Sequence, residues 1–334
     1  MNILFDGNFL FHKTFSVWSM YYNDRKKSAE ENEKLLIDAL KDKEKRQVLI
    51  RKLLIDMCAA INRFKDVKRV AVVIDSHSWR YGFYNDYKYA LTRVRGQYYK
   101  YFLNMLDEFE RFLRKRGFIV SRVMGAEGDD LLYIWSIYFT TVLEEDLVII
   151  TGDSDIRQLI SDKCSLFCNN SKNLKFFCHK SRFVEWNEYF DTDVMIEAVN
   201  PYEIMLYKVV MGDKSDNIDK LRKGFGEAAF TKFKQSFVMP TSFNDNKTLL
   251  QQAEFISQKF VDFTKMEYEE VLGKVLFNLK MTWLNLSVYN EQNFLYENGK
   301  SLLENMLDDV LRNKDKYKYS KPFTLENIYG DIIK

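Results

Sequence analysis

Three short apolar segments, each leading to an aspartate, constrain the fold of this chain more than any other feature. The segments ILF, RVAVVI and LVII lead to Asp6, Asp75 and Asp153, the last through Thr151 and Gly152. Continuous apolar strands separated by helical stretches are typical of a parallel sheet, and such sheets place their sites at the carboxyl edge of the strands. We therefore predict an α/β fold with a mainly parallel central sheet, helices on both faces and these three aspartates at one edge.

The composition excludes several classes of protein. The 334 residues are enough for one large domain or two smaller ones. The 50 Lys and Arg nearly balance the 48 Asp and Glu, so the net charge of +2 does not identify a partner. No stretch has the length and apolar character of a membrane span, the start MNILFDGNF does not resemble a signal peptide, and four cysteines are too few for a disulfide framework. We expect a soluble protein of the reducing cytoplasm, without membrane contact.

Three of the cysteines and one histidine lie close together in the sequence and could bind zinc. They are Cys164, Cys168, Cys178 and His179. The segments CSLFC and LKFFCH also have the composition of two short strands joined by a turn, in which each cysteine acts as a small apolar residue. We favour the pair of strands over the zinc site.

Further carboxylates follow the predicted strand ends. The motif EGDD opens an apolar helix, TGDSD follows the third strand, and MGDKSDN lies further along the chain. With the first two strand ends, these motifs contribute nine carboxylates: Asp6, Asp75, Glu127, Asp129, Asp130, Asp153, Asp155, Asp213 and Asp216. Helix capping explains only one or two of them, and so many like charges need a cation in order to lie together. Oxygen ligands without histidine favour Mg²⁺ or Mn²⁺, and a pair of such ions suits the hydrolysis of phosphodiesters.

The segment 76–126 is basic and aromatic. It contains ten Lys and Arg residues against four Asp and Glu residues. Between positions 79 and 95 the basic residues are interleaved with Trp, Tyr and Phe, a mixture that suits phosphate pairing and base stacking. For positions 111–116 we favour the alternative of a solvated helix face. We therefore predict that the segment directly after Asp75 binds nucleic acid.

The motifs FDGN, VVIDS, EGDD, TGDSD and GDKSDN, in this order, resemble those of the 5′-nuclease superfamily of flap endonucleases and phage 5′ to 3′ exonucleases. The resemblance spans about residues 2–237. Within the superfamily, the stretch IDSHSWRYGFYNDYK most resembles the ribonuclease H of T-even bacteriophages, which is a relative of flap endonucleases and does not have the true ribonuclease H fold. The resemblance implies the same α/β fold, of the PIN-like kind, with a basic helical arch and a helical C-terminal part.

The resemblance also implies roles for the carboxylates. One metal ion would be surrounded by Asp6, Asp75, Asp129 and Asp153. A second ion would be served, mostly through water, by Asp155, Asp213 and Asp216. Glu127 would lie between the two ions and Asp130 beside them. The implied cofactor is a pair of Mg²⁺ ions, with Mn²⁺ as a substitute.

Basic residues of the arch are implied to handle the substrate. Arg80 and Lys88 match positions that hold and polarise the scissile phosphate, and Arg93 or Arg95 matches another position in the same arch. Tyr84 could stack on a terminal base. In the family, the arch admits single-stranded 5′ ends and so restricts cleavage to structured substrates.

The sequence departs from the family after the last acidic motif. The family commonly continues with Ile-Pro and a Gly-x-Gly-x-Lys hairpin that grips duplex DNA, often with a monovalent cation. Here Ile218 is followed by Asp219, and the segment GFGE lacks the lysine. We expect the duplex grip to be rebuilt from other basic residues, namely Lys220, Arg222, Lys223, Lys232 and Lys234. The alternative interpretation of GFG is a simple turn between helices.

These observations predict a catalytic domain at residues 1–185, including the arch at 76–100. Residues 186–334 would form a helical part with the last acidic motif (213–216) and a duplex-binding helix-turn-helix. The expected function is that of a structure-specific 5′ nuclease, a 5′ to 3′ exonuclease and flap endonuclease with ribonuclease H activity that removes RNA primers and 5′ flaps in phage DNA replication.

The expected partners are DNA with 5′ flaps or ends and RNA–DNA hybrids. Residues 240–334 could close the duplex side of the site, or contact a single-strand-binding protein or sliding clamp, and we expect a monomer. Two alternatives stay open: a PIN-type endoribonuclease, and a catalytically silent, structure-specific DNA-binding protein of the same fold.

Overall fold

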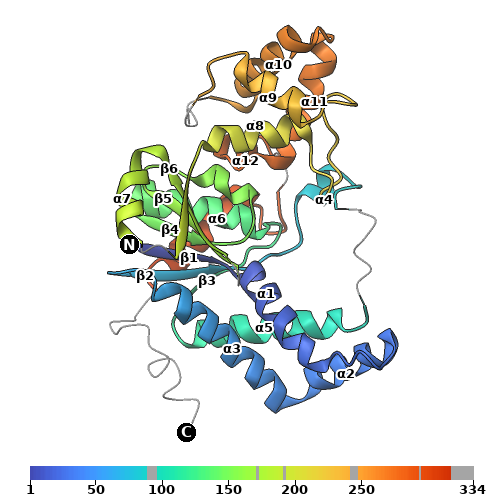
Figure 1. Cartoon of the computed structure of the whole chain (residues 1–334), viewed down its shortest axis with the longest axis vertical. Coiled ribbons are helices and arrows are strands. Elements are labelled where there is room, and N and C mark those ends of the chain that lie inside the picture. The colour runs from blue at the N-terminus through green and yellow to red at the C-terminus, as the bar shows by residue number, and fades with distance from the viewer. Residues whose placement is uncertain (89–95, 171–172, 191–192, 241–246, 293–294, 317–334) are drawn as a thin grey trace.

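The computed structural model contains residues 1–334 and describes all of them except 89–95, 171–172, 191–192, 241–246, 293–294 and 317–334. Its centre is a sheet with the strand order β3-β2-β1-β4-β5-β6-β7. The strands are β1 (Asn2–Asp6), β2 (Arg69–Val73), β3 (Ile119–Ser121), β4 (Leu147–Ile150), β5 (Cys164–Asn170), β6 (Asn173–His179) and β7 (Val194–Val199). All neighbouring pairs are parallel except β5 and β6. The predicted mainly parallel α/β fold is thus confirmed (Figure 1).

Helices cover both faces of the sheet. In chain order the α-helices are α1 (Gly7–Ser19), α2 (Ala29–Lys41), α3 (Lys43–Ile61), α4 (Arg80–Phe83), α5 (Tyr99–Lys115), α6 (Gly128–Ile137), α7 (Phe183–Tyr189), α8 (Pro201–Met211), α9 (Glu227–Gln235), α10 (Leu249–Thr264), α11 (Tyr268–Thr282), α12 (Leu286–Asn290) and α13 (Leu302–Asn313). None of the described helices is both long enough and apolar enough to cross a membrane.

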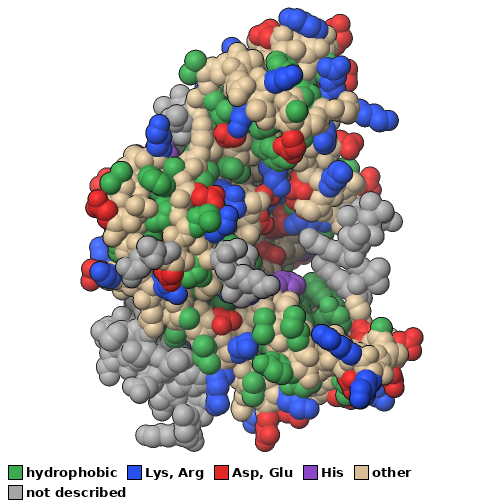
Figure 2. All heavy atoms as spheres, in the orientation of Figure 1, with side chains coloured by type: hydrophobic (Ala, Val, Ile, Leu, Met, Phe, Trp, Pro, Cys, Tyr) green, Lys and Arg blue, Asp and Glu red, His purple; other side chains and the backbone are tan. Residues whose placement is uncertain are grey.

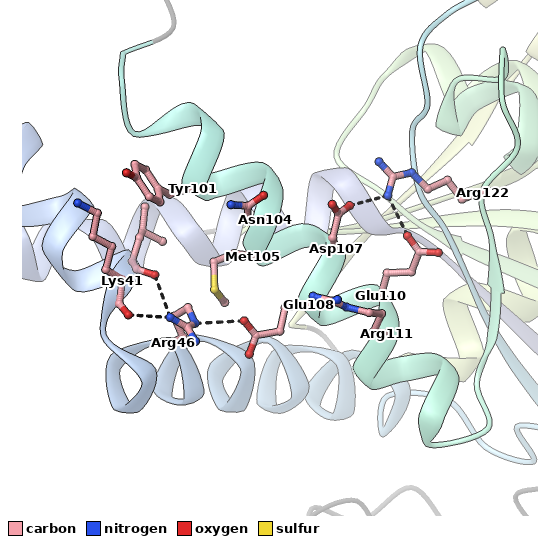
Figure 3. A pocket seen from close by; sticks show the side chains of 11 residues that line it. Lys41, Arg46, Tyr101, Asn104, Met105, Asp107, Glu108, Glu110, Arg111 and Arg122 are labelled. Atoms are coloured by element: carbon pink, nitrogen blue, oxygen red, sulfur yellow. Dashed lines mark hydrogen bonds and ion pairs between the residues drawn. The ribbon is translucent and has the colours of Figure 1, made fainter.

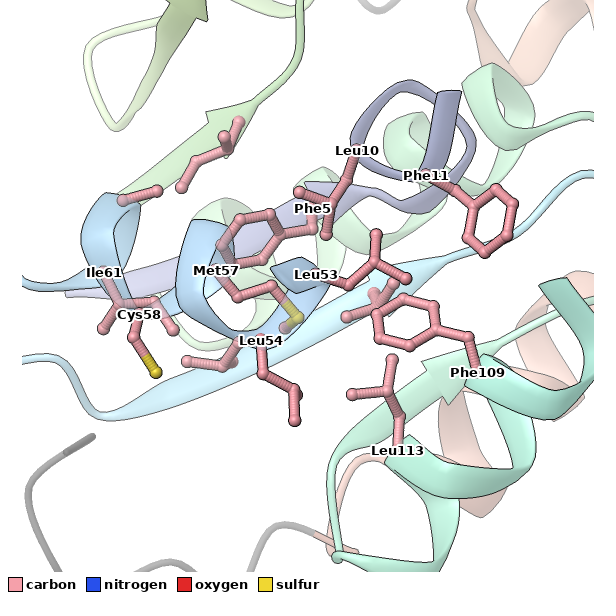
Figure 4. Packing of buried hydrophobic residues seen from close by; sticks show 14 of the residues in the cluster. Phe5, Leu10, Phe11, Leu53, Leu54, Met57, Cys58, Ile61, Phe109 and Leu113 are labelled. Atoms are coloured by element: carbon pink, nitrogen blue, oxygen red, sulfur yellow. The ribbon is translucent and has the colours of Figure 1, made fainter. Parts of the chain in front are cut away.

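The alternation of side chains along β1 shows how the two faces are filled. Ile3 and Phe5 point into the core formed with α1, α3 and α5, whereas Leu4 points into the core formed with α6 and α13. Figure 4 shows Phe5 packed among side chains of α1 and α3, including Leu10 and Met57. Because a continuous apolar strand buries both faces, β1 is fixed between the two layers and its end is held in place.

The C-terminal helices pack into two different hydrophobic cores. Helices α8 to α11 form a separate helical body around a core of their own, at the top of Figure 1. Helix α13 instead packs against α6 and β3, where Met306 is fully buried. The part predicted to be helical also contains β7, which pairs with β6, so the sheet continues beyond residue 185. The segment MIEAV is short and half-buried, and its pattern alone does not distinguish a strand from the start of a helix.

The segment rich in cysteine forms the predicted pair of strands. In this antiparallel pair Leu166 lies opposite Phe177. Cys164 packs into the core with α6, whereas Cys178 packs into the core on the other face of the sheet. These two thiols therefore cannot share a zinc ion, and burial raises the pKa of each.

Candidate functional site

Three neighbouring parallel strands bring their carboxyl ends to one edge of the sheet. Asp6 lies opposite Val73, the last residue of β2, and Phe5 lies opposite Ile150, the last residue of β4. Asp75 and Asp153 follow these strand ends within a few residues. The strand register thus brings the three strand ends together at one edge, as predicted.

The N-terminus of α6 closes over the same edge. The backbone N–H of Gly128 donates to Oδ1 of Asp75 at 2.6 Å. A Cβ atom at position 128 would lie 2.7 Å from that oxygen, so a larger residue would push the Asp75 carboxylate out of this position. The contact places Glu127 and Asp129, which flank Gly128, beside the strand-end carboxylates.

Neutral donors orient the carboxylates of β1 and β2. Asp6 accepts hydrogen bonds from the Phe9 N–H at 2.9 Å and from the Thr151 hydroxyl at 2.8 Å. The Asn8 side chain donates to Oδ2 of Asp75 at 2.8 Å and accepts from its N–H at 2.9 Å. Sequence reasoning missed both orienting residues. Asn8 stands within the motif FDGN, which offered a signal, whereas Thr151 becomes an Asp6 partner only through strand pairing.

We call Asp6, Asp75, Asp129 and Asp153 the first carboxylate group. Burial, together with the charges of Asp75 and Asp153, raises the pKa of Asp6 to about 7. Burial and the Glu127 charge raise the pKa of Asp75, and burial and the Asp153 charge raise that of Asp129. Raised pKa values mean that the ionised group lacks sufficient compensation by positive charge. The first carboxylate group is therefore a place where a bound cation lowers the free energy.

The donor set fits a hydrated Mg²⁺ or Mn²⁺ ion. Among the described residues, no three His, Cys, Asp or Glu side chains are close enough to form a ready-made cage for a metal ion. Mg²⁺ needs no such cage, because it keeps several waters and is commonly bound through one or two carboxylates. Figure 2 shows acidic side chains gathered in the hollowed middle of the molecular face. The site is thus open and oxygen-lined rather than closed.

Arg80 and Asp130 form a buried pair, which differs from the roles expected for them. The Arg80 guanidinium donates to both oxygens of Asp130, at 2.9 and 3.1 Å, and its Nε donates to the Met281 carbonyl at 2.9 Å. The Tyr289 hydroxyl donates to Asp130 at 2.8 Å. Arg80 is 3% exposed and Asp130 is 0% exposed. Because these contacts occupy their polar atoms away from solvent, Arg80 and Asp130 hold each other in place without a phosphate or a metal ion.

The carboxylate of Glu127 also has more hydrogen-bond donors around it than expected. Its carboxylate accepts from the Ser78 hydroxyl at 2.9 Å, from the Tyr87 hydroxyl at 2.8 Å, from Arg80 and from Lys88. Although burial acts in the opposite direction, the charges of Arg80 and Lys88 keep the pKa of Glu127 below its ordinary value. Glu127 therefore anchors the base of the predicted arch to the acidic edge. Arg93 and Arg95 lie outside the described residues.

We call Asp155, Asp213 and Asp216 the second carboxylate group. Lys208, on α8, lies between two of them, with its Nζ 2.8 Å from Oδ2 of Asp155 and 2.5 Å from Oδ2 of Asp213. Burial raises the pKa of Asp216 to about 6 in spite of the Lys88 charge. Sequence reasoning missed Lys208, because its partner Asp155 is distant in the chain and the short helix that carries Asp155 packs against α8 only in the folded protein.

The predicted nucleic-acid contacts fall into two kinds. Tyr84 is half-buried, its hydroxyl donates to the Asn217 carbonyl at 3.2 Å and its ring packs edge-on against Phe277. The basic residues expected to grip a duplex lie around the turn between α8 and α9. In this set Arg222, Lys223 and Lys232 are exposed, whereas Lys220 donates to the Phe225 carbonyl and Lys234 pairs with Glu203.

A cavity of about 760 Å³ lies between α5, the end of α2 and the start of α3, away from the strand ends. Figure 3 shows that most of its charged side chains pair with one another, Arg46 with Glu108 and Arg122 with Asp107 and Glu110. These ion pairs neutralise all of the described acidic side chains that line the cavity, so it has no cluster of unpaired carboxylates for a metal ion. The acidic edge is therefore the stronger candidate for chemistry.

Comparisons with known proteins agree with this geometry. Residues 1–187 match the family model of the 5′-3′ exonuclease N-terminal, resolvase-like domain. A 5′-3′ exonuclease of Bacillus subtilis is 31% identical over 132 residues, and the match spans 39% of this chain and 40% of that protein's length.

Two solved structures from T5 are similar in fold. A T5 5′-exonuclease with bound divalent metal ions (zinc) has a TM-score of 0.59 at 16% identity, covering 94% of this chain and 100% of its own. A T5 flap endonuclease complex with DNA and metal ions has a TM-score of 0.55 at 17% identity, covering 94% and 99%. Since the family model matches more than half of the chain, this protein belongs to the family of 5′-3′ exonucleases defined by the N-terminal resolvase-like domain.

Proposed function

We propose that this protein is a metal-dependent phosphodiesterase that cleaves DNA at 5′ ends and flaps, and RNA in RNA–DNA hybrids. The observation that carries the proposal is the first carboxylate group, which β1, β2, β4 and α6 assemble at one sheet edge. The raised pKa values of Asp6, Asp75 and Asp129 support a cation-binding role. Asp130, which is buried and paired with Arg80, has no such need of a cation.

The two carboxylate groups would hold Mg²⁺, with Mn²⁺ as a substitute. Asp6, Asp75, Asp129 and Asp153 would serve one ion, and Asp155, Asp213 and Asp216 a second. Such ions lower the pKa of the attacking water and stabilise the leaving oxygen. The chain's own residues supply the orientation: Asn8 and Thr151 fix the carboxylates, and the neutral donors leave their negative charge in place.

Lys88 would bind the scissile phosphate from the base of the arch. Its ammonium donates to Glu127 and lies close enough to Asp216 and Asp129 for their charges to raise its pKa, although burial opposes this. An ammonium has three donors, so the contact with Glu127 leaves capacity for a phosphate oxygen. Arg93, Arg95 and Tyr84 would complete the arch at 76–100.

The proposal also covers the domain boundaries, the biological role and the partners. Residues 1–185 would form the catalytic domain, and residues 186–334 would carry the motif 213–216 and grip the duplex through the α8–α9 turn. The protein would act as a cytoplasmic monomer that removes RNA primers and 5′ flaps in phage replication and releases short 5′-phosphorylated products. Residues 240–334 would close the duplex side or contact a single-strand-binding protein or sliding clamp.

The test is cleavage of a 5′-labelled flap duplex, beside a blunt duplex and an RNA–DNA hybrid, with Mg²⁺ or with excess chelator. We expect short labelled products that require Mg²⁺. Asp153→Asn should lower turnover by about 100-fold or more, as for other losses of transition-state charge stabilisation, while flap binding is retained. Asp262→Asn, at an exposed position on α10, is the matched control and should cleave like the wild type.

Two results would contradict the proposal. Tight flap binding without cleavage in Mg²⁺ or Mn²⁺ would favour the catalytically silent DNA-binding protein. Cleavage of single-stranded RNA within the strand, with no preference for a 5′ end, would favour the PIN-type endoribonuclease.

A further inference from the structure

Lys208 bridges two of the carboxylates proposed to serve a second divalent ion. Its Nζ lies 2.8 Å from Asp155 and 2.5 Å from Asp213, so it pairs with two of the three members of the second carboxylate group. Resting on the proposed function, we infer that the Lys208 ammonium competes with a divalent ion for Asp155 and Asp213. The first carboxylate group would then bind a divalent ion tightly, and the second would bind one weakly unless the ammonium leaves.

The first carboxylate group has no such competitor. Among the residues that the structure describes, no ion pair joins a Lys or Arg to Asp6, Asp75, Asp129 or Asp153. Their recorded partners are neutral: backbone N–H groups, the Asn8 amide and the Thr151 hydroxyl. In the first group an entering ion therefore meets carboxylates with no ammonium directly paired to them in the described part of the chain, although Lys88 lies near Asp75 and Asp129. In the second group it meets an ammonium paired with two of the carboxylates.

The competing contact is built into the fold. Lys208 is only 18% exposed in its side chain, and α8 packs against the short helix that begins at Asp155. The other oxygen of Asp213 accepts from the backbone N–H of Ser215 at 2.8 Å and from its hydroxyl at 2.6 Å, which fixes the carboxylate toward Lys208. Because these groups are already ordered, the ion pair costs little conformational entropy and is a strong rival for a cation.

The direct test is calorimetric titration of the full chain with Mn²⁺ in the absence of nucleic acid. For the wild type we expect one tight and one weak binding event. Lys208→Met keeps the length of the side chain but removes its charge, and it should tighten the weak event by about tenfold or more, a typical coupling between neighbouring sites, without changing the tight one. Lys214→Met removes the same charge from an exposed position beside Asp213 and should bind Mn²⁺ like the wild type.

A second readout covers a loss of stability in Lys208→Met. Without metal, this variant should melt at a lower temperature than the wild type, because Asp155 and Asp213 lose their partner. With saturating Mn²⁺ its melting temperature should rise by more than that of the wild type, since a tighter ligand stabilises the native state more. Lys208→Arg keeps the positive charge and should keep the weak second event.

The possible failures are distinguishable. If Lys208→Met leaves the second binding constant and the Mn²⁺-induced rise in melting temperature unchanged, the competition does not exist, although the proposed function stands. If neither the wild type nor any variant binds Mn²⁺ or Mg²⁺, the metal-dependent nuclease is ruled out, and the role of Lys208 with it.

Discussion

Arg80 illustrates what decides a role at the scale of single residues. The resemblance to the 5′-nuclease superfamily implied that it holds the scissile phosphate. In the fold its guanidinium instead satisfies Asp130 and the carbonyl of Met281, which is 201 positions along the chain. A sequence shows that a basic residue lies near acidic ones, but the direction of its side chain depends on partners that only tertiary structure supplies.

Replacement of Arg80 should therefore affect stability first. Arg80→Gln leaves the fully buried Asp130 carboxylate without its cation, and we expect the free energy of unfolding to fall by about 3–5 kcal/mol. Arg222→Gln, at an exposed position, should change it by about 0.5 kcal/mol or less. Urea unfolding of both variants is the measurement. An Arg80→Gln protein that keeps its stability but cleaves slowly would instead support direct contact between Arg80 and the scissile phosphate.

At the scale of secondary-structure elements, local pattern was sufficient for some elements and not for others. The strands β1, β2 and β4 are continuous apolar runs, and all three were predicted. Strand β3 has only three residues, and β7 is half-buried and interrupted by Glu197, so the first is too short and the second is not a continuous apolar run. The meeting of Asp6, Asp75 and Asp153 was predictable because parallel strands share a carboxyl edge, whereas the contacts of Lys208 and Tyr289 needed the packing of distant helices.

The amino ends of the same three strands are joined by Glu145. It accepts from Asn2 at 2.9 Å, from Arg69 at 2.6 Å and from Lys68 at 2.9 Å. Partial burial opposes ionisation, but these hydrogen bonds and charges lower the pKa of Glu145 from 4.5 to about 2. A carboxylate with a depressed native pKa stabilises the fold above its unfolded pKa, and this stabilisation is lost as the pH falls toward the native value.

Glu145→Gln should consequently lower the free energy of unfolding by about 1 kcal/mol at pH 7. The difference from the wild type should shrink between pH 4.5 and pH 2, because Glu145 of the wild type is protonated first in the unfolded state and then in the native state. Urea unfolding at several pH values between 7 and 3 measures this. A difference that is constant over this range would mean that the charge of Glu145 contributes nothing.

The turn between α8 and α9 should govern the binding of duplex DNA. Arg222 and Lys223 are exposed and adjacent there. If each contacts one phosphate, their joint replacement by alanine should reduce the slope of log affinity against log salt by about 1.8, since each contact contributes about 0.9. Fluorescence anisotropy with a blunt duplex provides the slope. The matched control is joint replacement of Lys26 and Lys27, two exposed lysines before α2, which should leave the slope unchanged.

At the scale of the whole molecule, the C-terminal helices contribute to two different hydrophobic cores. Helices α8 to α11 surround their own core, but α13 packs on α6 and so supports the helix that carries Glu127 and Asp129. The sequence showed that this region is helical and apolar. It could not show which body each helix joins, because amphipathic helices of similar composition can cover either core.

Replacement of Met306 tests whether α13 supports α6 in this way. It is fully buried between α13 and α6, so Met306→Ala should cost about 2–5 kcal/mol of unfolding free energy. Leu307, its neighbour on the same helix, is 45% exposed, and Leu307→Ala should cost far less. Equal unfolding midpoints of the two variants in urea would show that α13 is not part of the core.

The network around Asp130 has a consequence for how the protein is made. A ribosome that has translated as far as Asp216 has already produced all nine acidic side chains, but not the Met281 carbonyl or the Tyr289 hydroxyl that fix Arg80 and Asp130. Because a growing chain emerges from its N-terminus, these last contacts form late. The nascent chain therefore completes the contacts that fix Asp130, at the start of α6, only after Tyr289 has been translated.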